Sequence, residues 1–138
     1  MRWTMMMAGA GIAMMMACGI ARADDMPDCS KAQTQSDLNI CSEQDFETAD
    51  AALNAQYKAT RAAMQAIDTD LDADMKGADK ALLAGQRRWI AYRDGQCEAE
   101  GFQARGGSME PMLVSGCKAA MTRLRTKELK ALADGSGN

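Results

Sequence analysis

The sequence predicts an all-α fold, a small antiparallel three-helix domain stapled by two disulfides. The chain is rich in alanine, holds only two prolines and has few β-branched residues, a composition that favours helices. Apolar residues recur at steps of three and four, and no stretch alternates convincingly as a strand would. Four cysteines remain once a leader peptide is removed, and an even number in a short exported chain is typical of disulfides.

Residues 1–23 have the order of features of a secretory signal peptide. A positive charge at Arg2 precedes an apolar run over 5–20, and small residues follow at Ala21 and Ala23. Glycines interrupt the run, and it is shorter than the about 20 residues that a membrane span needs. We therefore predict cleavage after residue 23, no membrane span, and a secreted or periplasmic protein.

A second interpretation places a lipid anchor at Cys18, because a cysteine that follows the small residue Ala17 could be lipidated. The segment lacks the leucine that usually begins a lipoprotein cleavage box, and the later A-x-A site fits better. We therefore favour cleavage after Ala23, which leaves a helical domain over 24–133 and a flexible tail over 134–138.

The mature chain is acidic. Residues 1–23 hold two arginines and no acid, so 14 basic and 19 acidic side chains remain, a net charge of −5. The phosphates of a nucleic acid would repel such a chain. A basic protein would be attracted, since opposite charge steers association. The composition thus predicts a protein partner and no nucleic acid.

Apolar stripes and turn residues delimit the three helices. The first begins near Ser36 and ends where acids accumulate over 68–79, and the second runs to about Glu100. A glycine-rich loop over 101–111 precedes a third helix that begins near Met112. Short loops predict antiparallel neighbours. The stripe positions are Leu38, Phe46, Ala49, Leu53, Tyr57, Met64 and Ile67, then Leu82, Leu83, Gln86, Trp89, Ile90, Arg93 and Cys97, then Leu113, Cys117, Met121, Leu124 and Leu132.

The four mature cysteines are Cys29, Cys41, Cys97 and Cys117. Zinc is disfavoured, because the chain has no histidine and the cysteines show no C-x-x-C spacing. If the second and third helices fold back about a loop centred at Gly107, Cys97 comes level with Cys117. That leaves Cys29 to pin the N-terminal arm to Cys41, so we predict these two disulfides.

No catalytic residue, metal or cofactor is predicted. The absence of histidine removes the commonest general base and the histidine-activated nucleophiles. Carboxylate pairs such as Asp94 with Glu98 indicate an exposed helix face more readily than a glycosidase site. Acids at alternate positions over 68–74 begin an EF-hand-like pattern, but Ala73 stands where that loop needs glycine and Asp79 where it needs glutamate. A solvated turn explains this stretch better.

The run QRRWIAYRDGQC over 86–97 is the most specific part of the chain. Trp89 and Arg93 stand four apart, so on a helix the guanidinium can lie along the indole. Folding back about the acidic turn brings Arg93 level with Asn54 and within a helical turn of Asp50, and a charge buried between helices needs one of them as partner. We predict a structural clasp, with a basic-aromatic nucleic-acid patch as the alternative that the acidic charge disfavours. The clasp residues are Asp50, Asn54, Tyr57, Gln86, Trp89, Arg93 and Asp94.

Five segments resemble, in order, the pattern of the LprI-like lysozyme-inhibitor domain family: DCSKAQTQSDLNIC, ADAALNAQY, QRRWIAYRDGQC, GGSMEPMLVSGC and MTRLRTKEL. The resemblance covers about Asp28 to Leu132. The chain departs from the pattern at Arg88 and Gly95, where small or acidic residues are common, and neither departure touches the framework. The matching positions are Cys29, Thr34, Gln35, Asn39, Cys41, Asp50, Leu53, Asn54, Tyr57, Gln86, Trp89, Arg93, Asp94, Cys97, Gly107, Ser108, Cys117, Thr122, Arg125 and Leu129.

The resemblance implies an exported bacterial helical domain that works by binding and not by catalysis. The family takes its name from a mycobacterial lipoprotein that inhibits lysozyme, and the leading expectation is a lysozyme inhibitor-like protein that acts on a muramidase. A lysozyme is usually basic, so a partner with a charge of −5 gains association rate. The rivals are an envelope interaction module with a non-lysozyme partner and a stress-related structural protein.

The candidate partner-binding surface is the loop over 106–112, with Gly107, Ser108 and Glu110. A carboxylate on a protruding loop could enter a cleft built to bind sugar. The alternative is that Gly107 and Ser108 only shape the turn and cap the third helix.

Overall fold

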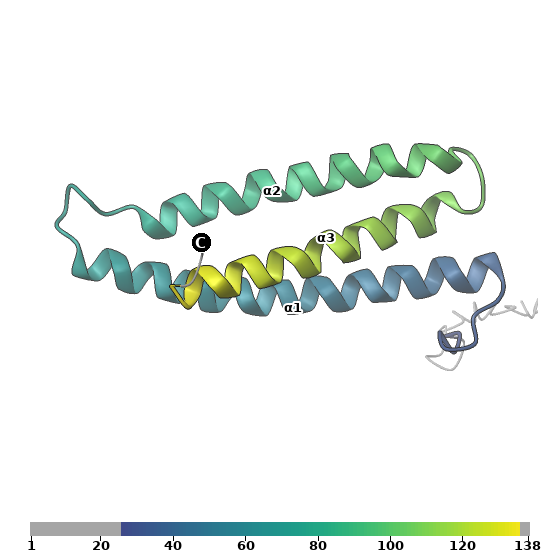
Figure 1. The fold of residues 1–138 in the computed structure, drawn as a ribbon, viewed down its shortest axis with the longest axis horizontal. Helices are drawn as coiled ribbons and strands as arrows, with labels where there is room; N and C mark the ends of the chain where they lie inside the picture. The colour runs from purple at the N-terminus through teal and green to yellow at the C-terminus, as the bar shows by residue number, and fades with distance from the viewer. Residues whose placement is uncertain (1–25, 136–138) are drawn as a thin grey trace, which may run out of the picture.

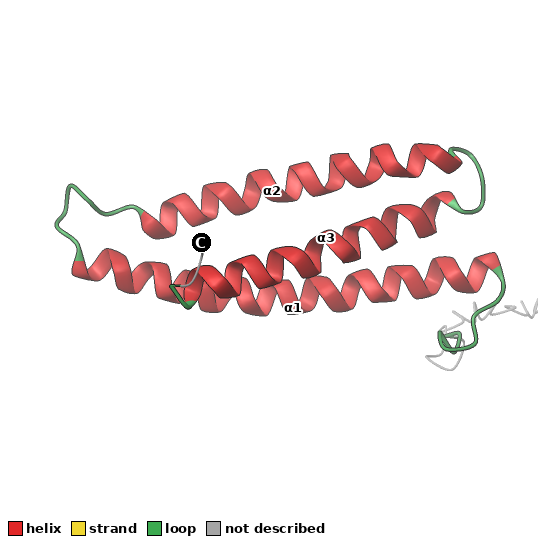
Figure 2. Ribbon diagram, in the orientation of Figure 1, coloured by secondary structure: helices red, strands yellow, loops and turns green. Residues whose placement is uncertain are grey.

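The computed structural model describes residues 26–135, so the predicted signal peptide, Cys18 and the last three residues of the tail lie outside the described residues. Three long helices form the fold: α1 (Gln35–Asp70), α2 (Ala78–Gly101) and α3 (Glu110–Ala133), with a short 3₁₀-helix η2 (Phe102–Ala104) after α2. Consecutive helices run antiparallel, so α1 and α3 run in the same direction (Figures 1 and 2). The predicted all-α, three-helix fold is confirmed.

Local sequence sets where α1 and α3 begin. Thr34 is the N-cap of α1, and its hydroxyl accepts a hydrogen bond from the backbone N–H of Asp37 at 3.1 Å. Helix α3 begins at Glu110, two residues before the predicted start. Pro111 lies in its first turn, where the N–H that proline lacks has no partner within the helix anyway.

The acidic turn between α1 and α2 caps the second helix. The carboxylate of Asp68 accepts hydrogen bonds from the backbone N–H groups of Gly77, Ala78 and Asp79, at 2.7, 2.8 and 3.1 Å. These bonds, the one from Gly77 first, hold the pKa of Asp68 below its ordinary value. Gly77 is the N-cap residue, has a φ of 150° and offers no side chain of its own, so Asp68 replaces the usual cap.

The core is formed by all three helices, in the half of the bundle that contains the α1–α2 turn. Leu53, Met64, Leu82 and Leu129 form its buried cluster. The hydroxyl of Thr60 is fully buried there and donates to the backbone carbonyl of Leu129 at 2.9 Å, which fastens α1 to α3. The remaining partly buried hydrophobic residues on this cluster are Tyr57, Ala63, Ala78 and Trp89.

The predicted buried stripe of α3 is partly wrong. Leu124 and Leu132 are 59% and 41% exposed. The residues of α3 that are buried instead are Ser115, Ala119, Thr122 and Leu129. The hydroxyls of Ser115 and Thr122 have hydrogen-bond partners on the neighbouring helices. Their burial is therefore tolerated, and the face of α3 that packs mixes hydroxyl-bearing with apolar residues. The predicted stripe positions Ile67 on α1 and Ile90 on α2 are also exposed.

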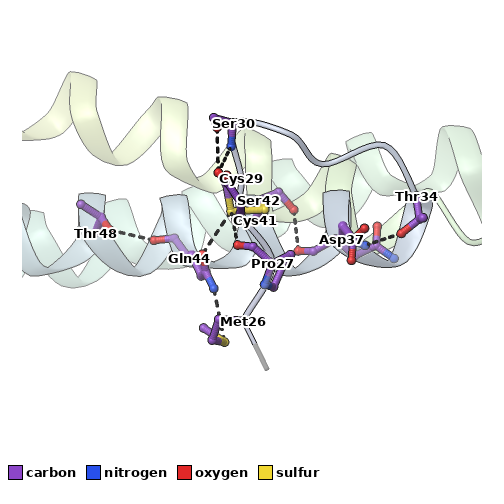
Figure 3. Close-up of a disulfide and its surroundings, with 12 residues drawn as sticks. Met26, Pro27, Cys29, Ser30, Thr34, Asp37, Cys41, Ser42, Gln44 and Thr48 are labelled. Atoms are coloured by element: carbon purple, nitrogen blue, oxygen red, sulfur yellow. Dashed lines mark hydrogen bonds between the residues drawn. A yellow bond between two sulfur atoms is a disulfide. The ribbon is translucent and has the colours of Figure 1, made fainter. Parts of the chain in front are cut away.

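Both predicted disulfides are present. Cys29 and Cys41 have Cα atoms 5.6 Å apart and join the N-terminal arm to the second turn of α1, as Figure 3 shows. Cys97 and Cys117 have Cα atoms 5.5 Å apart and join α2 to α3. Fold-back about a loop centred at Gly107 therefore gave the correct pairing of Cys97 with Cys117.

Gly101 lets the end of α2 approach α3. It is buried, and a Cβ atom placed on it would lie 2.5 Å from Cγ2 of Val114. A side chain at position 101 would therefore require Val114 or its helix to shift.

Candidate functional site

Arg93 lies at the centre of a polar cluster between all three helices. Its side chain is 8% exposed, and Nη1 lies 3.2 Å from Oδ1 of Asp50 on α1. Nε donates to Oδ1 of the neighbouring Asp94 at 2.9 Å. Nη1 also donates to the hydroxyl of Thr122 on α3, at 3.2 Å. One buried guanidinium therefore connects α1, α2 and α3.

Two aromatic rings cover the same guanidinium. The Cζ atom of Arg93 lies 5.0 Å from the ring centre of Phe46 and 5.2 Å from that of Trp89. A desolvated cation gains from such ring faces as well as from its carboxylates. The burial of Arg93 is thus matched by two anions, a hydroxyl and two rings, which is what keeps a buried charge tolerable.

A second arginine extends the cluster. Arg125 donates from Nε to Oε1 of the buried Gln86 at 3.0 Å, and its Cζ lies 5.9 Å from the Trp89 ring. Asn54 donates to the other carboxylate oxygen of Asp50, Oδ2, at 2.8 Å. Asp50 therefore holds Arg93 with one oxygen and Asn54 with the other.

The structure brings most of the predicted clasp together. Asp50, Asn54, Trp89, Arg93 and Asp94 form one connected network, and Gln86 joins it through Arg125. Tyr57 packs on the core cluster, but its hydroxyl is buried and has no hydrogen-bond partner in the described part of the chain.

Sequence reasoning did not assign Phe46, Thr122 or Arg125 to the cluster. A signal for Thr122 existed, because the fold-back that pairs Cys97 with Cys117 also places Thr122 beside Arg93. Phe46 was expected only as a stripe residue. Periodicity predicts that Phe46 faces the other helices, but it does not specify which side chain of α2 it contacts.

The predicted partner-binding loop is held together by Glu110, whose carboxylate binds donors of the loop itself. Glu110 accepts from Nη1 of Arg105 at 2.6 Å and from the backbone N–H of Gly106 at 2.8 Å. Those two donors, the Gly106 N–H first, lower the pKa of Glu110. The carboxylate expected to reach a partner is therefore already bound within the loop.

Gly106, Gly107 and Ser108 shape the turn. Gly106 has a φ of +74°, which favours glycine, and a Cβ on Gly107 would lie 3.1 Å from the carbonyl oxygen of Ala104. The carbonyl of Ser108 accepts from Nδ2 of Asn39 at 3.0 Å, which ties the loop to α1. Ser108 does not cap α3, because the N-cap residue is Met109 and no side chain caps it.

The same loop carries an exposed apolar surface. Phe102 is 55% exposed and Met109 45% exposed. Together with Gln103, Ala104, Arg105, Gly107 and Ser108 they line an open hollow of about 480 Å³. We call residues 102–109 the loop tip.

Residues 26–135 contain no cluster of three histidine, cysteine or acidic side chains placed to hold a metal ion. Among these residues no helix has the length and apolar character needed to cross a membrane.

Three helices, two disulfides and a buried arginine network define a small disulfide-stapled helical domain. The sequence model described as "Lysozyme inhibitor LprI" matches residues 27–129, a range that contains α1, α2 and both disulfides and nearly all of α3. The chain therefore belongs to the LprI lysozyme inhibitor family, an inhibitor family and not a family of enzymes.

The chain is also similar to an uncharacterized protein of Rhizobium meliloti (strain 1021). The two are 60% identical over 115 residues, which cover 81% of this chain and 83% of that protein. No solved structure matches the chain.

Proposed function

We propose that the mature protein is exported and inhibits a lysozyme-type muramidase by binding to it. The observation that carries this proposal is the family match over residues 27–129, which extends across nearly the whole described structure. The two disulfides support export, since such bonds persist in oxidising compartments.

The rigidity of the domain supports inhibition by binding. Cys97–Cys117 and the loop bonds of Glu110 fix the α2–α3 connection before any partner arrives. A surface that is already ordered loses less conformational entropy on association. The acidic mature chain adds electrostatic attraction for a basic enzyme.

A lysis assay tests the proposal. Oxidised mature protein is titrated into lysozymes of several structural classes, and the clearing rate of a bacterial cell-wall suspension is measured. We expect at least one class to lose activity in proportion to added protein, with inhibition weakened by salt. An unrelated acidic protein of similar size and charge is the control. Full activity of every class at a large molar excess would refute the proposal.

A further inference from the structure

The bundle has an uneven charge distribution along its length. We call the half that holds both disulfides, residues 26–52 and 90–121, the disulfide end; it lies on the right in Figure 1. This half holds ten acidic and four basic side chains, whereas residues 53–89 and 122–135 hold seven acidic and ten basic ones. The net charges are −6 and +3, so the excess of negative charge lies in the disulfide end, although the opposite half also holds the acidic turn over 68–79.

Ion pairing within the disulfide end uses all of its cations. Lys31, Arg93, Arg105 and Lys118 each pair with an acid of the same half. Several acids of this half remain in no ion pair within the described residues: Asp37, Glu43, Glu47, Glu98 and Glu100. The negative field at this end is therefore not neutralised locally.

The loop tip lies at the extremity of this acidic end. Its two exposed hydrophobic side chains, Phe102 and Met109, border the open hollow. Exposed apolar residues surrounded by polar ones mark sites of protein association, and large aromatic side chains often serve as anchors there. Arg105 lies over the Phe102 ring, with its Cζ 4.5 Å from the ring centre, and so restrains the ring's position.

Another hollow of the structure fits a basic partner less well. The hollow of about 310 Å³ beside Tyr57 is lined by Lys58 and Arg61 and lies in the positively charged half. A basic protein would be repelled there and attracted to the disulfide end. The apolar loop tip and the charge distribution thus favour the same surface.

We propose that the loop tip, flanked by the unpaired acids of the disulfide end, is the surface that docks on a basic lysozyme-type enzyme, with Phe102 and Met109 as its anchors. This inference rests on the function proposed above. The two anchors slow dissociation of the complex, and the acids speed association with the basic enzyme.

Anchor variants test the docking surface. Phe102→Ser with Met109→Ser is compared with Ile67→Ser with Met75→Ser, a matched control because those residues are 45% and 58% exposed in the opposite half. Binding to a lysozyme that the unmodified protein inhibits is measured by biolayer interferometry, with thermal melting as the folding check. We expect the tip variant to bind at least about tenfold more weakly and the control to bind normally.

Charge variants provide the second arm. Glu47→Gln with Glu98→Gln is compared with Asp70→Asn with Asp72→Asn, which removes the same charge from the opposite half. At physiological salt, where the screening length is about 8 Å, the first pair should slow association several-fold and the second should leave it unchanged.

The outcomes separate the two proposals. If the unmodified protein binds no lysozyme, the proposed function fails and the docking surface fails with it. If it binds a lysozyme but the tip variant and the control variant bind equally well, the function stands and the docking surface is wrong. An equal slowing by both charge pairs would likewise show that the acidic end has no special part in association.

Discussion

Arg93 is the residue on which the packing of the three helices most depends. Arg93→Ala removes the guanidinium from between Asp50, Asp94 and Thr122 and leaves Asp50 without its cation. Asp94 keeps only the more distant Lys118, whose Nζ lies 3.9 Å from Oδ1 of Asp94. Breaking a buried ion pair costs about 3–5 kcal/mol, and we expect about 3 kcal/mol because Asp50 is partly exposed. Chemical denaturation measures this loss.

The matched control is Arg88→Ala, which lies on the exposed face of α2 a little more than one helical turn before Arg93. It should change the free energy of unfolding by no more than about 0.5 kcal/mol. If Arg93→Ala and Arg88→Ala changed the free energy of unfolding equally, the Arg93 cluster would make no specific contribution to stability. Because Arg93 is buried away from the loop tip, we expect Arg93→Ala to lower stability and to leave lysozyme binding by the remaining folded protein unchanged.

Two glycines of α2 should respond in opposite directions to the same substitution. Gly101→Ala forces a Cβ against Val114, and overpacking of this kind costs about 1–3 kcal/mol. Gly95→Ala meets nothing within 4 Å on an exposed helix face, so it should stabilise by about 0.5–1 kcal/mol. Melting temperatures of the two variants check the pair. A stabilised Gly101→Ala protein would contradict the close approach of α2 and α3.

The start of α2 depends on two carboxylates, and this makes the element sensitive to acid. Hydrogen bonds from Arg61 lower the pKa of Asp79 to about 2, and backbone N–H groups lower the pKa of Asp68. A carboxyl group with a depressed folded-state pKa stabilises the fold above its unfolded value of about 3.9. That stabilisation is lost as the pH falls toward about 2.

We therefore expect the melting temperature to fall between about pH 5 and about pH 2, and to fall less in Asp68→Ala, which already lacks one of the contributing groups. Asp72→Ala is the control, because the Asp72 side chain has no hydrogen-bond or ion-pair partner in the described residues. Thermal unfolding is monitored by circular dichroism at several pH values across this range. Identical pH profiles for the unmodified protein and Asp68→Ala would rule out the capping role.

The elements differ in how far the sequence could predict them. Helices α1 and α2 follow from apolar periodicity, and fold-back about a short loop suffices to pair Cys97 with Cys117. The buried face of α3 could not be predicted in this way, because Thr122 and Ser115 are buried through hydroxyl hydrogen bonds that join α3 to the other helices. A periodicity argument counts such residues as polar and places them outside.

The candidate site likewise has contacts that the sequence could predict and contacts that it could not. The pairing of Arg93 with Asp50 could be predicted, since a charge on an apolar stripe needs an opposite charge at the same level of the neighbouring helix. The position of Glu110 could not, because its closure onto Arg105 depends on the path of the backbone through Gly106 and Gly107. A loop conformation of this kind has no periodic signature.

At the scale of the whole molecule, a rigid bundle presents an acidic, disulfide-bonded end. The α2–α3 disulfide and the Arg93 cluster hold the helices that support the loop tip. The opposite half carries the positive charge and the Asp68 cap. On the proposed docking surface, stability and partner binding depend on different residues of one small domain. We therefore expect Arg93 variants to lose stability and Phe102 variants to lose binding.

The central claim is tested most directly by isothermal titration calorimetry. The calorimeter measures the binding of oxidised mature protein to a purified basic lysozyme at low and at high salt. Saturable binding with a defined stoichiometry, accompanied by loss of muramidase activity and weakened by salt, is the result that a family inhibitor with a charge of −5 should give. The absence of heat and of inhibition across the lysozyme classes, with a protein that melts cooperatively and holds both disulfides, would contradict it.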